Sequence, residues 1–207
     1  MDYNLESLKS FFTEYKSESV NKHSFFSVLI PLVEHDGDLF VLLEKRAAHI
    51  SQPGEICFPG GHIEAGEPPQ AAARRECSEE LGIGEQEIEI LAQGDTLYGQ
   101  ADFTLYSYIG KISYETYSNI KKESGEVEAV YLFPLSHFIE NEAEIFEEEY
   151  CTNMKNFPYE KVGIPFDYKW RRGTMQIPIY EINGIVIWGM TAQLLRKLSE
   201  KIRKALK

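Results

Sequence analysis

Apolar side chains recur with helical spacing near both ends of the chain. At the N-terminus they lie three or four residues apart, which predicts an amphipathic helix over residues 4–16. The same spacing predicts a C-terminal helix over residues 189–206. A third helix is expected over residues 68–81, because Pro68 suits a first turn and Gly82 suits a C-terminal cap.

Between the helices, runs rich in β-branched and aromatic residues predict strands. Residues 24–33 and 39–45 are joined by the turn-forming sequence HDGD, which indicates a hairpin. Further strands are expected over residues 86–93, 103–112 and 126–133. The mixture of strands and helices in this order favours a single α/β or α+β sandwich.

Three other segments complete the expected organisation. A long loop rich in glycine and proline is expected over residues 46–66. The acidic stretch 141–150 fits either a helix or a strand. Asn183-Gly184 stands between two apolar runs and predicts a tight β-hairpin.

Composition restricts the partners without naming one. The chain has 33 acidic and 21 basic side chains, and its net charge of −12 opposes binding to nucleic acid or anionic membranes. No apolar run approaches the roughly 20 residues that span a bilayer, and the first residues lack the order of a signal peptide. Cys57, Cys77 and Cys151 form no CxxC pair, so neither a zinc site nor a disulfide framework is expected. We therefore expect a cytoplasmic protein with no nucleic-acid or membrane partner.

Three glutamates of the middle helix form the first candidate site. Glu76, Glu79 and Glu80 stand at positions i, i+3 and i+4, so their carboxylates share one side of the helix. Like charges at this spacing repel unless a cation neutralises them, and Mg²⁺ prefers oxygen ligands. Taken alone, the run has an ordinary alternative, a solvated acidic helix face.

The surrounding residues resemble the Nudix box. Gly61 is followed after five residues by Glu67, and after seven more by RECSEELGI, residues 75–83. The family pattern is Gly-x5-Glu-x7-Arg-Glu-U-x-Glu-Glu-x-Gly-U, where U is apolar, and Cys77 fits the first U because free cysteine behaves as a small hydrophobe. All nine specified positions match at fixed spacing, so the resemblance is specific.

This resemblance implies a fold and an activity. The fold is α/β, a Nudix-type α/β/α sandwich with a mixed central sheet and a loop–helix–loop catalytic motif. Residues 1–207 would form a single domain with helical additions at both ends. The activity is metal-dependent hydrolysis of a phosphoanhydride in a nucleoside diphosphate derivative, with Mg²⁺ or Mn²⁺ as cofactor. The cations would offset phosphate charge and lower the pKa of an attacking water, whose proton a carboxylate accepts.

The matching positions also imply individual roles. Arg75 corresponds to an arginine that orients a glutamate, while Glu67, near the helix N-terminus, has either a functional or a purely structural role. Glu79 is the first choice for the proton acceptor and Glu126 the second, although Glu126 has the alternative of a solvated strand-edge charge. The metal ligands implied are three helix carboxylates and the backbone carbonyl just before the box, namely Glu76, Glu79, Glu80 and Gly60.

The segment before the box resembles the coenzyme A diphosphatase branch of the family. That branch carries Leu-Leu-x-x-Arg-(Ser/Ala)-x3-Arg-x3-Gly-x3-Phe-Pro-Gly-Gly, and residues 42–61 match it except that the second Arg is missing and the spacing from Arg46 to Gly54 is one residue shorter. The resemblance implies substrate contacts at Arg46, Phe58 and Gly61. It implies coenzyme A or acyl-CoA as substrate, cleaved to 3′,5′-ADP and 4′-phosphopantetheine or its acyl form.

Other interpretations stay open at this point. The substrate is a small nucleotide in each, and ADP-ribose, a dinucleotide or a (d)NTP are alternatives to coenzyme A. A catalytically silent nucleotide-binding module is a further alternative, and a homodimer is neither required nor excluded. The sequence IWGMTAQLL looks like the ending of the same branch, but ordinary packing would place Trp188 in the core. Arg171 and Arg172 beside Trp170 fit either a nucleotide contact or, more commonly, a solvated loop.

Overall fold

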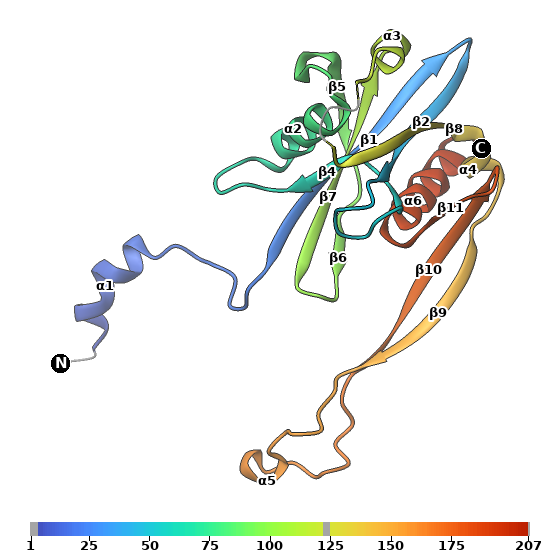
Figure 1. The fold of residues 1–207 in the computed structure, drawn as a ribbon. Helices are drawn as coiled ribbons and strands as arrows, with labels where there is room; N and C mark the ends of the chain where they lie inside the picture. Colours follow the sequence, from blue (N-terminus) through green and yellow to red (C-terminus); the bar gives the residue numbers. More distant parts are fainter. Residues whose placement is uncertain (1–3, 122–124, 207) are drawn as a thin grey trace.

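The computed structural model describes residues 4–121 and 125–206, and a mixed sheet of eight strands forms its centre (Figure 1). Its strands are β1 (Ser24–His35), β2 (Asp38–Arg46), β3 (Ile56–Cys57), β4 (Gly60–His62), β5 (Ile88–Gln93), β6 (Leu97–Gly99), β7 (Phe103–Ile112) and β8 (Val127–Pro134). The path through the sheet is β3-β2-β1-β7-β5, while β4, β6 and β8 pair with β1, β7 and β2. Strand β1 runs antiparallel to β2 and parallel to β7, so the central sheet is mixed, as expected.

The two central strands direct alternate side chains to opposite faces of this sheet. Leu29 of β1 and Leu42 of β2 belong to one buried cluster, and Ile30 and Leu43 belong to the other. The hairpin that sets their register turns at Asp36 and Gly37, which both have positive φ (52° and 85°). The continuous apolar character of these strands is thus explained by burial on both faces.

Helix α2 (Pro69–Leu81) covers the first face. Its buried side chains Ala73, Cys77 and Leu81 pack in the cluster that contains Leu29 and Leu42. The helix ends at Gly82, whose left-handed conformation (φ 63°) lets its N–H bond to the Ser78 carbonyl. Of the acidic positions of the helix, Glu79 is exposed, whereas Glu80 is buried with the packed side.

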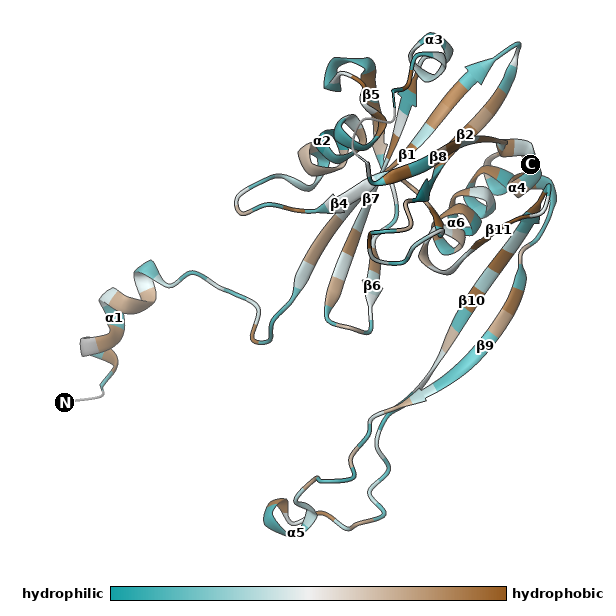
Figure 2. Ribbon diagram, viewed as in Figure 1, coloured by the Kyte–Doolittle hydropathy of each residue, from teal (hydrophilic) through white to brown (hydrophobic). Residues whose placement is uncertain are grey.

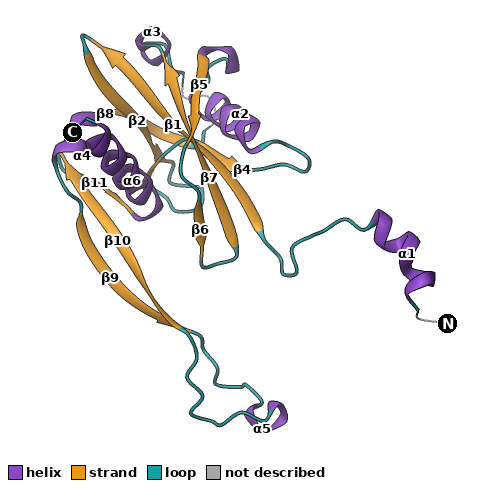
Figure 3. Ribbon diagram, turned by 180° about the vertical axis from the view of Figure 1, so that it is seen from behind, coloured by secondary structure: helices purple, strands orange, loops and turns teal. Residues whose placement is uncertain are grey.

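Helix α6 (Gly189–Ala205) covers the second face, opposite α2 (Figure 3). Its buried residues Ala192, Leu194 and Leu195 pack with Ile30 and Leu43 of the sheet. The short helix α4 (Leu135–Glu140) adds Phe138 to the same cluster. The result is the α/β/α arrangement that the sequence predicts.

A second, three-stranded sheet extends from this face as a long arm (Figure 1). It consists of β9 (Glu144–Cys151), β10 (Arg172–Ile182) and β11 (Ile185–Trp188), in the order β11-β10-β9. The predicted hairpin is present, because Asn183 and Gly184 join β10 to β11 with positive φ at both residues. The ambiguous acidic stretch 141–150 is mostly strand β9, and the arm's tip carries the short helix α5 (Tyr159–Val162).

Several elements differ from the sequence expectation in detail. The loop expected over residues 46–66 contains the two short strands β3 and β4, because their backbone pairs with β2 and β1. The strand expected from residue 86 begins at Ile88, after the 3-10 helix η1 (Glu85–Glu87). The short helix α3 (Tyr114–Ser118) begins after Ser113, whose side chain accepts a bond from the Thr116 N–H. These short elements lie below the length at which periodicity is informative.

The N-terminal helix α1 (Leu5–Glu14) forms where expected but packs on nothing described. Leu5 and Phe11 are 70% and 56% exposed, and the helix lies apart from the sheet with its apolar residues uncovered (Figure 2). The C-terminal helix, in contrast, buries Ala192, Leu194 and Leu195. Among the described helices, none combines the length and apolar character needed to traverse a bilayer.

Candidate active site

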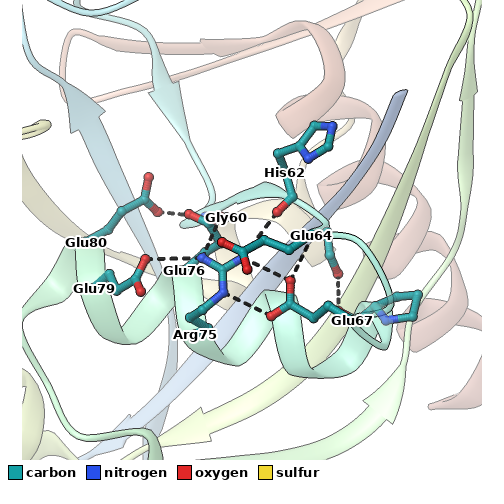
Figure 4. A network of polar contacts seen from close by, with 10 residues as sticks. Gly60, His62, Glu64, Glu67, Arg75, Glu76, Glu79 and Glu80 are labelled. Carbon is teal, nitrogen blue, oxygen red and sulfur yellow. Dashed lines mark hydrogen bonds and ion pairs between the residues drawn. The ribbon is translucent and has the colours of Figure 1, made fainter. Parts of the chain in front are cut away.

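Arg75 of α2 gathers the glutamates of the Nudix-like segment (Figure 4). Its Nε and Nη2 donate to the two carboxylate oxygens of Glu67, at 2.9 and 3.0 Å. Its Nη1 donates to Glu76 at 2.9 Å and to Glu79 at 3.2 Å, and its Nη2 also reaches the His62 carbonyl. The bidentate bond lowers the pKa of Glu67 and raises that of Arg75, so both remain charged. Arg75 therefore fixes the positions of three carboxylates at once.

Glu67 has a structural place in this arrangement. Besides its two bonds from Arg75, its Oε2 accepts the backbone N–H of Glu64 at 3.0 Å. Both carboxylate oxygens are thus occupied by groups that hold the loop before α2 against the helix. This geometry supports the structural alternative for Glu67 over a role in binding a cation.

Strand β4 brings the backbone against the other two helix carboxylates. The Gly60 N–H donates to Glu80 Oε2 at 2.7 Å, and a Cβ at Gly61 would overlap the carboxylate of Glu76. Gly60 has φ 154°, and a Cβ there would overlap the backbone of Ser27 and Val28. Gly60 is required because the backbone of β1 leaves no room for a Cβ, whereas a Cβ at Gly61 would displace the Glu76 carboxylate.

Burial makes the charges of this cluster costly. Glu80 is only 5% exposed, and burial raises its pKa, as do the charges of Glu44, Glu76 and Glu126, against the bond from Gly60. Burial also raises the pKa of Glu76, although the bond from Arg75 opposes it. Ionising all of these carboxyl groups would thus place more negative charge here than Arg75 neutralises.

Glu44, on β2, is a member of this cluster that sequence reasoning missed. It is 1% exposed, and burial raises its pKa, with Arg46 opposing and Glu126 adding to the rise. The Cys57 thiol lies 3.8 Å from its Oε1, and burial together with the Glu44 charge raises the pKa of Cys57 to about 12. Cys57 therefore stays protonated and is no nucleophile. The only sequence signal was an acid directly after the apolar run of residues 39–43.

Glu126 stands just before β8, beside the same acids. Its carbonyl accepts the Ala47 N–H at 2.7 Å, and its charge raises the pKa of both Glu76 and Glu80. Its side chain is exposed. Glu126 thus lies near Glu76 and Glu80, and its role as second choice for the proton acceptor stays a prediction.

The chemistry of these donors fits a divalent cation that prefers oxygen. Two buried carboxyl groups, Glu44 and Glu80, cannot both ionise without nearby positive charge, and Glu44 Oε2 has no hydrogen-bond partner among the described residues. Within residues 4–121 and 125–206, no three acidic, histidine or cysteine side chains stand ready arranged for a metal ion. Instead, Arg75 binds Glu76 and Glu79, and Gly60 binds Glu80. A cation would have to take over carboxylate oxygens from these partners.

A cavity of about 560 Å³ opens on the other side of β4. Its volume is typical of a small-molecule site. All three residues expected to contact substrate line it, namely Arg46, Phe58 and Gly61, and Gly60 lines it as well. Gly60 and Gly61 therefore lie between the acidic cluster and the cavity and contact both.

Arg46 is held in place by the segment that lacks the second arginine. Its Nε donates to the Ser51 carbonyl at 2.8 Å, and its Nη2 lies 3.3 Å from Ser51 Oγ. The loop closes on Arg46, whose own N–H and carbonyl bond to Glu55 and Gly54. A register shift at Lys45/Arg46 turns the strand end toward the cavity.

The structure corrects the expectation for Trp188 and shows where the basic segment around Trp170 lies. Trp188, expected in the core, is 46% exposed and lines the cavity, because β11 ends there and α6 begins at Gly189. Trp170 instead packs on Phe157 at the tip of the arm, where Arg171 and Arg172 are exposed, and none of the three lines the cavity. The two arginines are thus exposed and away from the cavity, and Arg172 is the first residue of β10.

Comparison with known proteins gives a consistent assignment. The model of the NUDIX domain matches residues 23–152. Nudix hydrolase 3 of Caenorhabditis elegans is 42% identical over 120 residues, covering 56% of this chain and 50% of the relative. The peroxisomal coenzyme A diphosphatase of Mus musculus is 30% identical over 129 residues, covering 61% of this chain and 52% of the relative. The chain thus spans about half the length of these curated relatives.

The fold comparison extends further along the chain. A crystal structure of a MutT/nudix family protein from Enterococcus faecalis aligns with 98% of this chain and 70% of its own, with a TM-score of 0.51 and 15% identity. At that identity the likeness concerns the fold alone, and it includes regions beyond the matched domain. From the domain match and this architecture, the chain belongs to the Nudix family.

Proposed function

We propose that this protein hydrolyses a phosphoanhydride bond in a nucleoside diphosphate derivative, with Mg²⁺ or Mn²⁺ as cofactor. One observation carries the proposal: Gly60 and Gly61 contact the carboxylates of Glu80 and Glu76 on one side and line the cavity on the other. A substrate held in the cavity would therefore present its phosphates where the acidic cluster meets the backbone of β4.

The residues of the chain have separable tasks in this reaction. Glu76, Glu79, Glu80 and the Gly60 carbonyl would hold the cation, which supplies positive charge to the phosphate oxygens and lowers the pKa of water. Glu79, the exposed member, accepts the proton of the attacking water, with Glu126 as the second choice. Arg75 keeps Glu76 and Glu79 oriented, and its raised pKa keeps it charged throughout.

Arg46 is the residue of the cavity best suited to a phosphate of the substrate. Ser51 fixes its guanidinium with one short and one longer bond, so little side-chain entropy is lost when a phosphate binds. Phe58 and Trp188 supply apolar and aromatic surface for the remainder of the substrate. A guanidinium at one end and aromatic walls at the other suit a nucleotide.

Coenzyme A or acyl-CoA is the substrate we propose, cleaved to 3′,5′-ADP and 4′-phosphopantetheine or its acyl form. The match to the branch motif around Arg46 and the mouse relative's name support it. So does a second hollow of about 710 Å³, which shares Phe103 and Met190 with the cavity. Together the two hollows have room for a long, two-ended substrate.

A substrate panel tests the proposal. Product formation from coenzyme A, its 3′-dephospho form, ADP-ribose, NADH and dNTPs is measured by chromatography, with Mg²⁺ and Mn²⁺ in parallel. We expect cation-dependent cleavage and a preference for coenzyme A over its dephospho form. Faster turnover of ADP-ribose, a dinucleotide or a dNTP would replace the substrate assignment while keeping the reaction. Binding of these nucleotides without any turnover would identify a catalytically silent module instead.

A further inference from the structure

Glu44 is a buried acid outside the Nudix box. Burying its carboxylate lowers the stability of the fold, and no strong hydrogen bond offsets this cost. It is 1% exposed, and its Oε2 makes no hydrogen bond to any group of the described residues. Its Oε1 has the Cys57 thiol at 3.8 Å, and a thiol is a weak donor. Buried carboxylates in proteins normally have partners for both oxygens, so an unpartnered one requires an explanation.

The strand geometry directs Glu44 toward α2. Side chains two residues apart on a strand share a face, and Leu42 packs in the cluster beneath α2. Glu44 is paired in the sheet with Cys57 on β3 and Val130 on β8. It therefore points into the layer between the sheet and the helix that carries Glu80.

The charged groups around Glu44 leave this layer negative. Glu80 faces it from α2 and Glu126 from the start of β8, while Arg46 on its own strand is the cation that acts on it. The guanidinium of Arg46 is bonded to Ser51. Of the neighbouring charges, that of Glu44 has the largest effect on Glu80.

We propose that Glu44 is a further carboxylate of the divalent-cation site, presenting its free oxygen from β2 toward the ion that α2 holds through Glu80. The inference rests on the proposed function, because it concerns the same cation. The ion would then have ligands from both the sheet and the helix, and it would join these two layers. A hard divalent ion suits the position, because it accepts carboxylate oxygens and neutralises two buried charges at once.

A purely structural role explains fewer of these observations. A glutamine or an apolar side chain of similar size would fill the same space without adding charge beside Glu80. Bonding to the Cys57 thiol involves Oε1 and leaves Oε2 unpartnered. A purely structural role would therefore not require a carboxylate at this position.

The test is direct binding of Mn²⁺, measured by calorimetry and by the paramagnetic resonance of free Mn²⁺. The variants are Glu44→Gln, Glu80→Gln and, as matched control, Glu34→Gln, an exposed glutamate of the neighbouring strand β1. We expect Glu44→Gln to weaken Mn²⁺ binding at least tenfold, and Glu34→Gln to bind like the unmodified protein. The cation-free melting temperature of Glu44→Gln should equal or exceed that of the unmodified protein, since a buried charge is removed.

The outcomes separate this inference from the proposed function. Normal Mn²⁺ binding by Glu44→Gln, with loss of binding by Glu80→Gln, would overturn the role of Glu44 alone. No Mn²⁺ uptake by the unmodified protein, with or without a nucleotide diphosphate, would overturn both. If Glu44→Gln does not fold, Glu44→Leu replaces it, because an apolar side chain removes the charge and needs no partner. Weak Mn²⁺ binding by a well-folded Glu44→Leu protein would support the inference equally.

Discussion

Both faces of the main sheet pack apolar side chains, but they differ in the polar groups that lie beside them. Under α2 the face borders the acidic cluster, in which Glu76 and Glu79 are bonded to Arg75 and Glu80 is bonded to the backbone of β4. Under α6 it is apolar and encloses a cavity, with Arg46 at its edge. The difference indicates a division of labour, in which one face supplies the chemistry and the other recognises the substrate. Substitutions on the two faces should therefore change different kinetic constants.

The largest effect is expected on the acidic face, for Glu79→Gln. We expect turnover to fall about 10²–10⁴-fold, because the amide cannot accept a proton from water. KM should change little, since Glu79 does not line the cavity. The side chain is 59% exposed and its bond to Arg75 is a surface pair, so the melting temperature should hardly move. Steady-state kinetics and thermal unfolding check these points together.

Glu85→Gln is the matched control for this variant, because Glu85 is exposed in the nearby helix η1. It should retain both turnover and stability. If Glu79→Gln also retained turnover, the proton would have to be accepted elsewhere. Glu126→Gln would then be the variant expected to lose it.

In the absence of a cation, the buried acids beside α2 should make the stability of the protein depend on pH. The pKa of Glu44 is raised from 4.5 to about 7, and that of Glu80 to about 9, chiefly by burial. A raised folded-state pKa means that the native state binds more protons than the unfolded one. The stabilisation is then complete below about pH 4.5 and is lost as the pH rises through about 7 to about 9. We expect the cation-free protein to melt at a temperature lower by on the order of 5 °C at pH 9 than at pH 6.

Added Mg²⁺ or Mn²⁺ should restore most of this loss at pH 9, because positive charge favours the ionised carboxylates. The measurement is thermal unfolding across pH, with chelator and with cation. Glu80→Gln should show a weaker pH dependence in chelator, since it removes one of the two titrating groups. Equal melting temperatures at both pH values in chelator would contradict the assigned electrostatics of this face.

The parts of the molecule that the sequence predicted are those set by local pattern. The helix carrying the glutamates was recognised from fixed spacing, from Pro68 and from Gly82, and Glu76 and Glu79 do converge on Arg75. The Asn183-Gly184 hairpin was recognised because two residues with positive φ determine it. Both depend on neighbours within a few residues, so tertiary context was not needed.

The parts that were missed depend on contacts distant in sequence. Glu44 joins the site only because β2 lies beneath α2, which brings it to Glu80, 36 positions along the chain. Trp188 looked like core because it ends an apolar run, yet its exposure is set by how β11 meets the cavity. The N-terminal helix has the right periodicity, but periodicity does not say whether another surface covers it.

Trp188→Ala should give the smallest effect, and it tests the recognition face. Aromatic stacking on a base contributes about 1–3 kcal/mol, so KM for the preferred nucleotide should rise about tenfold while turnover stays near its original value. Phe166→Ala is the control, because Phe166 is 84% exposed in the arm and lies outside the cavity. It should leave both constants unchanged. A large drop in melting temperature for Trp188→Ala, with no change in KM, would show that Trp188 serves packing and not substrate binding. The aromatic wall of the cavity would then consist of Phe26, Phe58 and Phe103. If this face binds the substrate, substituting these three residues would have to raise KM.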